Sequence, residues 1–162
     1  MIEIADSARV SALADIEDSV RGTLIRVGSR SMIDSFVKVK PAGGRGDLLI
    51  GSDCYINAGT VIYTGNGVTI GDNVLIAANC TLAATNHAFA DRSRLIRTQG
   101  FQPSRGGIVI EDDVWIGAGS VLLDGAILHR GCVVGANSLV SGELEEYGIY
   151  VGSPARKTGS RT

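Results

Sequence analysis

The sequence predicts an all-β fold, a parallel β-helix whose coils have three flat faces. Apolar residues recur every six positions, which matches neither the period of about 3.6 of an α-helix nor the simple alternation of a strand. Aromatic residues make up only 5 % of the 162 residues, whereas glycines number 22. A core of stacked aliphatic layers therefore fits this chain better than a core built on large rings.

The repeat divides into blocks of six residues that each open with Ile, Leu or Val. Grouped in threes, these blocks form six sets of 18 residues, separated by insertions. We expect each set to form one coil, with one block on each face and the opening residue inside the prism. Because neighbouring coils lie about 4.8 Å apart, six coils predict a prism about 30 Å long. The opening positions are 4, 10, 16, 27, 33, 39, 50, 56, 62, 70, 76, 82, 110, 116, 122, 128, 134 and 140.

The fifth position of a block is usually small or apolar, and we expect it to point inward near a corner. Cys54, Cys80 and Cys132 all occupy this position, so we interpret them as buried packing residues instead of nucleophiles or metal ligands. Gly, Asn and Asp at the third and fourth positions permit corner turns, where positive φ is often needed.

The length of the chain predicts one domain over residues 1–162, since 162 residues are enough to form a single hydrophobic core. The net charge of −2 does not indicate a nucleic-acid partner or an anionic membrane. The opening MIEIADSARV lacks the basic start and apolar run of a signal peptide, and no stretch is long enough to span a bilayer. We therefore expect a cytoplasmic protein, in which the cysteines form no disulfide.

One long excursion interrupts the repeat, and it runs over residues 88–109. Long excursions from a regular scaffold are often functional. This excursion carries several arginines but only one acidic residue, Asp91. The arginines are suited to bind an anionic acceptor or the cofactor, and they are equally consistent with a solvent-exposed surface. They are Arg92, Arg94, Arg97 and Arg105.

His87 closes the last block before the excursion, at a sixth position that we expect to lie outside the core. An imidazole held there, beneath a basic loop, is a good general base at neutral pH. The only other histidine, His129, stands at the second position of its block, and we interpret it as a surface residue. A lone histidine is more often incidental than catalytic, so the position of His87 carries its candidacy.

The chain resembles the hexapeptide-repeat acyltransferases over roughly residues 27–157. The resemblance rests on the repeat, the Asn-His that closes a block at His87, the excursion, the Trp-Ile-Gly at Trp115 and the terminal Gly-x-Pro-Ala-Arg that ends at Arg156. The sugar O-acetyltransferases are most similar, of the galactoside and maltose type and of polysaccharide and O-antigen biosynthesis. The resemblance implies a left-handed β-helix, an exception to the usual right-handed crossover.

The resemblance also implies a homotrimer that binds acetyl-CoA between neighbouring prisms and needs no metal. His87 matches the histidine that takes the proton from an acceptor hydroxyl as its oxygen attacks the thioester. No acyl-enzyme forms, and proximity supplies much of the rate. Asn57 and Trp115 match positions at the acceptor. The positions that match contacts to CoA are Ala118, Ala136, Ser141 and Arg156.

Each of these assignments has a structural alternative. Asn57 also fits a corner turn, and Trp115 also fits a packing contact between subunits. The residues that match contacts to the pantetheine arm would occupy their blocks even in an inert prism; they are Ala118, Ala136 and Ser141. Only Arg156, whose guanidinium suits phosphate, lies beyond the regular repeat.

The chain departs from the family pattern at several positions. Galactoside-type members carry an acidic pair where this chain has Thr64 and Gly65, which weighs against a simple galactoside acceptor. A family lysine is replaced by Gly142, so one contact to CoA is lost. No helical segment precedes the first blocks, and the tail over residues 152–162 is short and polar.

The leading functional hypothesis is an acetyl-CoA-dependent sugar O-acetyltransferase of surface polysaccharide biosynthesis. N-acetylation of a nucleotide-linked amino sugar is a close alternative, because an amine acceptor needs the same base and the same cofactor. A non-enzymatic β-helix scaffold is a further alternative. A γ-type carbonic anhydrase needs three histidines at its zinc. This chain has only two histidines in total, so it cannot assemble that zinc site in the family's way. The sequence identifies neither the acceptor nor the acyl group.

Overall fold

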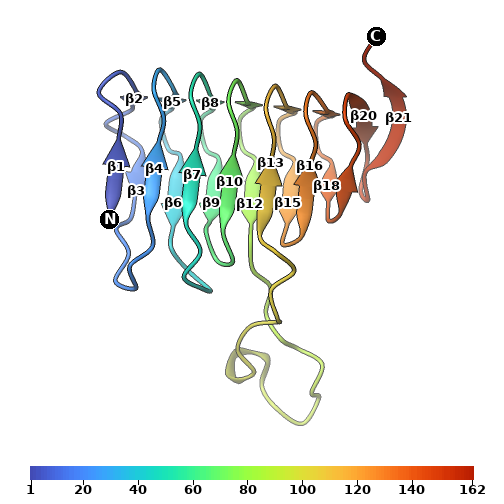
Figure 1. Ribbon diagram of the computed structural model, residues 1–162. Coiled ribbons are helices and arrows are strands. Elements are labelled where there is room, and N and C mark those ends of the chain that lie inside the picture. The colour runs from blue at the N-terminus through green and yellow to red at the C-terminus, as the bar shows by residue number, and fades with distance from the viewer.

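The computed structural model describes residues 1–162 and forms a prism with three parallel sheets as its faces (Figure 1). The first face contains β1 (Ile2–Ile4), β4 (Ile25–Val27), β7 (Leu48–Ile50), β10 (Val68–Ile70), β13 (Ile108–Ile110), β16 (Ala126–Leu128) and β19 (Glu143–Leu144). The second contains β2 (Arg9–Val10), β5 (Met32–Ile33), β8 (Tyr55–Ile56), β11 (Leu75–Ile76), β14 (Trp115–Ile116), β17 (Val133–Val134), β20 (Gly148–Val151) and β21 (Arg156–Ser160). The third contains β3 (Asp15–Ile16), β6 (Lys38–Lys40), β9 (Val61–Tyr63), β12 (Thr81–Ala83), β15 (Val121–Leu123) and β18 (Leu139–Val140).

The prism is a left-handed β-helix, as predicted. In Figure 1 the strands of the first face run upward in front while the coils advance from left to right. Each strand pairs in parallel with its equivalent in the next coil. Six complete coils are followed by β19 and β20 of a partial seventh, and only β21 pairs antiparallel.

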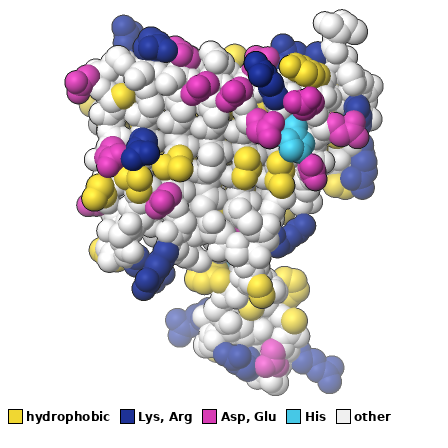
Figure 2. Space-filling model, in the orientation of Figure 1, with side chains coloured by type: hydrophobic (Ala, Val, Ile, Leu, Met, Phe, Trp, Pro, Cys, Tyr) yellow, Lys and Arg dark blue, Asp and Glu magenta, His cyan; other side chains and the backbone are white.

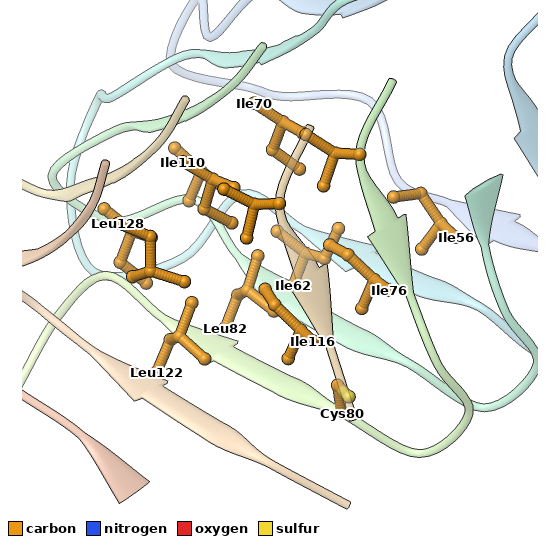
Figure 3. Packing of buried hydrophobic residues seen from close by; sticks show 14 of the residues in the cluster. Ile56, Ile62, Ile70, Ile76, Cys80, Leu82, Ile110, Ile116, Leu122 and Leu128 are labelled. Carbon is orange, nitrogen blue, oxygen red and sulfur yellow. The ribbon is translucent and has the colours of Figure 1, made fainter. Parts of the chain in front are cut away.

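The core consists of the predicted aliphatic layers. In the second to sixth coils, all the block-opening residues are at most 3 % exposed. Figure 3 shows Ile56, Ile76 and Ile116 stacked in this way, and their strands pair in register. Burying one such side chain contributes about 1.5–3 kcal/mol. In the first coil, Ile4 is exposed and Val10 is half-buried, because this coil has a neighbour on one side only.

The three cysteines are free and buried within this core. Burial raises the pKa of Cys54 and Cys80, and it raises the pKa of Cys132 to about 12. A thiol that stays protonated near neutral pH is a poor nucleophile, which supports a packing role for all three.

The excursion projects from the prism between β12 and β13 (Figure 1) and includes a short 3-10 helix, η1 (Ile96–Thr98). Its end is earlier than predicted. Ile108 and Val109 belong to β13, because they pair in register with Val68 and Thr69 of β10. The short polar tail forms a strand, since β21 pairs antiparallel with β20 and covers the end of the second face.

No helix in the structure has the length and apolarity needed to span a bilayer. Nor do three or more His, Cys, Asp or Glu side chains gather anywhere in a group suited to a metal ion.

Candidate functional site

His87 lies at the root of the excursion, where the chain leaves the corner between the third and first faces, here called the loop corner. It forms an isolated antiparallel bridge with Phe101, beside which the N–H of Gln102 donates to the carbonyl of Asn86 (2.8 Å). The imidazole stacks on the Phe101 ring, with centroids 4.8 Å apart and planes at 27°. The exposed imidazole is therefore held from both the backbone and one ring face, at the position that the repeat predicted.

The two histidines differ in what their ring nitrogens contact. No hydrogen bond engages the His87 ring within the chain, whereas both nitrogens of His129 are engaged. His129 Nδ1 lies 3.0 Å from Glu111 Oε1, and Nε2 lies 2.6 Å from Glu143 Oε1. These hydrogen bonds, that to Glu143 first, raise the pKa of His129. The interpretation of His129 as a plain surface residue is therefore incomplete, because it is half-buried and joins neighbouring coils.

Asp124, which follows β15 at the loop corner, is a residue that the sequence analysis missed. Its side chain is buried, with 1 % exposure. It accepts hydrogen bonds from the Asn66 side chain (3.0 Å) and from the backbone N–H groups of Arg105 and Gly107 (2.9 Å each). In the sequence it stands at a third block position and looks like any corner residue, so spacing gave no signal for this role.

The excursion presents both apolar and basic side chains to solvent. Phe89, Leu95 and Ile96 are all more than half exposed, and Figure 2 shows basic side chains around the projecting segment. Arg94 donates to the Thr98 carbonyl (2.6 Å). The excursion therefore offers positive charge and apolar surface together, close to the exposed imidazole.

Asn57 lies at a different corner from His87. It follows β8, at the corner between the second and third faces, and its Nδ2 donates to the Ile76 carbonyl of the next coil (2.9 Å). Asn57 therefore serves the corner turn, as its structural alternative predicted, and a single chain does not bring it to His87.

Ala118 and Ala136 are exposed at this same corner, in two successive coils. The N–H of Asn137 donates to the Ala118 carbonyl (2.9 Å). A Cβ added at Gly117 would meet the backbone nitrogen of Ala136 at 2.5 Å. We call this strip of small residues, Ala118 and Ala136, the alanine corner; both residues are exposed and carry only a methyl side chain.

Trp115 points outward from β14 and is 52 % exposed. Its register neighbours are Leu75 and Val133, and with Asp113 and Arg161 these residues line a shallow groove of about 270 Å³. This apolar row suits either a ligand or a neighbouring subunit, so both readings of Trp115 stay open.

Ser141 and Arg156 line one pocket of about 300 Å³ at the C-terminal end of the prism. The structure thus brings together one predicted contact to CoA from the repeat and one from beyond it. Gly142, where the family lysine is missing, lines the same pocket, and so does Lys157. Lys157 lies 2.6 Å from Glu145, which raises its pKa. Its position depends on the pairing of β21, which the sequence did not indicate.

Two family descriptions match the repeat. Residues 107–142 match the bacterial transferase hexapeptide (six repeats), and residues 48–84 match the hexapeptide repeat of succinyl-transferase. The two ranges correspond to the regular coils on either side of the excursion.

Two similar proteins carry names that describe acetyltransferases. The chain is 28 % identical over 161 residues to the probable acetyltransferase Rv3034c of Mycobacterium tuberculosis, which covers 99 % of this chain and 50 % of that protein. It is 32 % identical over 120 residues to the putative lipopolysaccharide biosynthesis O-acetyl transferase WbbJ of Escherichia coli, covering 71 % and 61 %. The chain thus spans only part of the length of these curated relatives.

Among solved structures, the chain is similar to a variant of AntD, an N-acyltransferase from Bacillus cereus. The TM-score is 0.83 at 26 % identity, and the match covers 99 % of this chain and 84 % of AntD. That structure was determined in complex with dTDP-4-amino-4,6-dideoxyglucose and coenzyme A.

Proposed function

We propose, since the repeat on both sides of the excursion matches hexapeptide transferase families, that the chain transfers an acetyl group from acetyl-CoA to a sugar hydroxyl. The acceptor is a sugar of surface polysaccharide or O-antigen biosynthesis. The observation that carries this proposal is His87, whose ring nitrogens are unengaged while its backbone and ring face are held at the root of the excursion.

His87 acts as the general base in a direct transfer. One ring nitrogen takes the proton of the acceptor hydroxyl as its oxygen bonds to the thioester carbonyl carbon. The carbon–sulfur bond then breaks, and the leaving thiolate of CoA takes the proton back from the imidazolium. An N–H near Ala118 donates to the developing oxyanion. A positioned base of this kind contributes about 10²- to 10⁴-fold in rate.

Acetyl-CoA binds along the alanine corner in this proposal. The exposed Ala118 and Ala136 accommodate the pantetheine arm, because their own side chains are small. The phosphates lie in the pocket that Ser141 and Arg156 line, where a guanidinium makes strong, charge-assisted hydrogen bonds. Lys157 adds the second positive charge that Gly142 cannot supply.

The active site forms between two subunits of a homotrimer. His87 and the alanine corner lie at different corners of one prism, so the alanine corner of a neighbouring subunit completes the site. Asn57 offers its Oδ1 to the acceptor, since its Nδ2 is already engaged. Trp115 covers the acceptor with its exposed face.

A second candidate is N-acetylation of an amino sugar on a nucleotide carrier. The excess of arginine in the excursion favours it, because a diphosphate binds guanidinium groups well. AntD, which is an N-acyltransferase with this class of sugar bound, also supports it.

Release of thiol from acetyl-CoA across a panel of acceptors tests these proposals. The panel pairs each neutral sugar with its amino sugar, both free and linked to a nucleotide. Release with hydroxyl acceptors supports O-acetylation, and release only with nucleotide-linked amines supports the second candidate. If no acceptor gives release and calorimetry detects no binding of acetyl-CoA, the chain is a scaffold and both enzymatic proposals fail.

A further inference from the structure

The carboxylate of Asp124 reaches three consecutive coils at the loop corner. Asp124 belongs to the fifth coil and Asn66 to the third, and the excursion leaves from the fourth coil between them. The Asn66 side chain donates to Asp124 Oδ2 across this gap (3.0 Å). The carboxylate thus closes the corner where the regular turn of the fourth coil is missing.

Both limbs of the excursion are tied to this carboxylate. The backbone N–H of Asn66 donates to the carbonyl of Ala84 (2.8 Å), from which the outgoing limb continues to His87. The returning limb donates directly, through the N–H groups of Arg105 to Oδ2 and Gly107 to Oδ1. One buried side chain therefore holds the two strands of chain that carry His87 and Phe101.

We propose that Asp124 is a positioning residue for His87. It fixes the separation of the two limbs, and the bridge between His87 and Phe101 then sets the direction of the imidazole. This inference rests on the proposed function for its catalytic consequence. With 1 % exposure, Asp124 does not touch the substrates, so it acts through the excursion alone.

The charge of Asp124 suits this role because it satisfies backbone donors that no neighbouring strand can reach. Arg105 and Gly107 precede β13, and both donate to the carboxylate. The side-chain amide of Asp124→Asn has one acceptor oxygen, which keeps the hydrogen bonds made at that oxygen position. At the other position the amide NH2 group faces an N–H donor, so the hydrogen bond there is lost. Asp124→Ala removes all three bonds.

The experiment compares Asp124→Ala and Asp124→Asn with the wild type in two readouts. The first is hydrogen–deuterium exchange of residues 84–107, together with the rate of trypsin cleavage at the arginines of the excursion. The second is kcat and the KM for acetyl-CoA. Asp72, whose Oδ1 accepts the N–H of Ser52 (2.6 Å) at the corner of the first and second faces, provides the matched controls Asp72→Ala and Asp72→Asn.

In Asp124→Ala we expect faster exchange and cleavage in the excursion, with kcat lower by about 10- to 100-fold, since a misplacement of about 1 Å costs that much. The KM for acetyl-CoA stays within about twofold, because Ala118 and Ala136, along which the pantetheine arm is proposed to lie, are at another corner and Arg156 is on β21. Asp124→Asn recovers part of kcat. The Asp72 variants change neither readout. A smaller folded fraction would also lower the apparent kcat at unchanged KM, so kcat is expressed per folded enzyme, with the folded fraction of each variant measured by circular dichroism.

Unchanged exchange at Arg105 and Gly107 in Asp124→Ala would overturn the proposal, and so would a loosened excursion with unchanged kcat. If Asp124→Ala does not fold, Asp124→Asn decides by the same criteria. Exchange and cleavage require no acceptor, so they test the anchoring even if the wild type transfers no acetyl group. A wild type that transfers no acetyl group would count against the proposed function alone.

Discussion

At the scale of single residues, the surroundings of a side chain separate His87 from His129. Both are partly open to solvent, but carboxylates engage both nitrogens of His129, whereas His87 is held by its backbone and by the face of Phe101. An imidazole whose nitrogens are free can accept a proton from a bound hydroxyl. An imidazole clamped by two carboxylates instead links secondary-structure elements.

Gly107 illustrates a backbone requirement at the base of the excursion. Its φ is +78°, and an added Cβ would meet the Gly67 carbonyl oxygen at 2.3 Å. Gly106 also has positive φ, +109°, but an added Cβ meets nothing within 4 Å. Gly106→Ala should therefore cost only backbone strain, about 1–3 kcal/mol, and Gly107→Ala clearly more. Chemical denaturation of both variants measures the loss in free energy of unfolding. Equal losses would contradict a steric contact between the added Cβ at Gly107 and the Gly67 carbonyl.

Arg156 and Lys157 provide the residue-scale test of the cofactor pocket. Replacing either with Ala should raise the KM for acetyl-CoA about tenfold, because a hydrogen bond to a charged group contributes about 1.5–3 kcal/mol. Arg26→Ala is the control, since Arg26 pairs with Glu3 at the opposite end of the prism. Steady-state kinetics at saturating acceptor measure the effect. An unchanged KM in both variants would show that the CoA phosphates do not bind in this pocket.

At the scale of elements, the Glu111–His129–Glu143 cluster links the last three coils through residues at or beside β13, β16 and β19. The pKa of His129 is raised above its ordinary 6.5, so its contribution is complete below that value and is lost as pH rises through the folded-state pKa. The pKa of Glu111 is lowered from 4.5, chiefly by His129, so its contribution is lost as pH falls through its folded-state pKa.

His129→Gln should therefore lower thermal stability most at about pH 5–6 and least at about pH 9. Partial exposure limits each pair to less than about 1 kcal/mol, which corresponds to a change in Tm of a few degrees. Melting curves of wild type and variant across this range measure the difference. A difference that does not vary with pH would show that the charges contribute nothing.

The coils were predictable because their determinants are local and repeated. Ile70, Ile76 and Leu82 stand at fixed spacing, and each must be buried for the next coil to stack. The position of His87 followed from the same register. The role of Asp124 did not, because its partner Asn66 is 58 residues away and meets it only after the coils have stacked. The position of Lys157 likewise depends on the pairing of β21 with β20, which the six-residue repeat does not predict.

At the scale of the whole molecule, the prism separates two halves of the proposed site. His87 lies at the loop corner, and Ala118 and Ala136 lie at the alanine corner. A rigid β-helix does not bend to bring them together, so in the proposed site a second subunit supplies the missing corner. Sedimentation should accordingly give the mass of a trimer.

Co-expression of two inactive variants tests this shared site. His87→Ala lacks the base, and Ala118→Trp fills the alanine corner. If each site combines His87 of one subunit with Ala118 of the next, random mixing restores about a quarter of the sites. Acetyl transfer by purified mixed trimers measures the recovery. A site contained within one subunit predicts no recovery at all.

The most direct test of the central claim compares His87→Gln and His129→Gln in acceptor-dependent thiol release from acetyl-CoA. We expect kcat/KM to fall by about 10²- to 10⁴-fold in His87→Gln and to be unchanged in His129→Gln at a pH where both variants are folded. Equal activity of His87→Gln and wild type would contradict the assignment of His87 as the base.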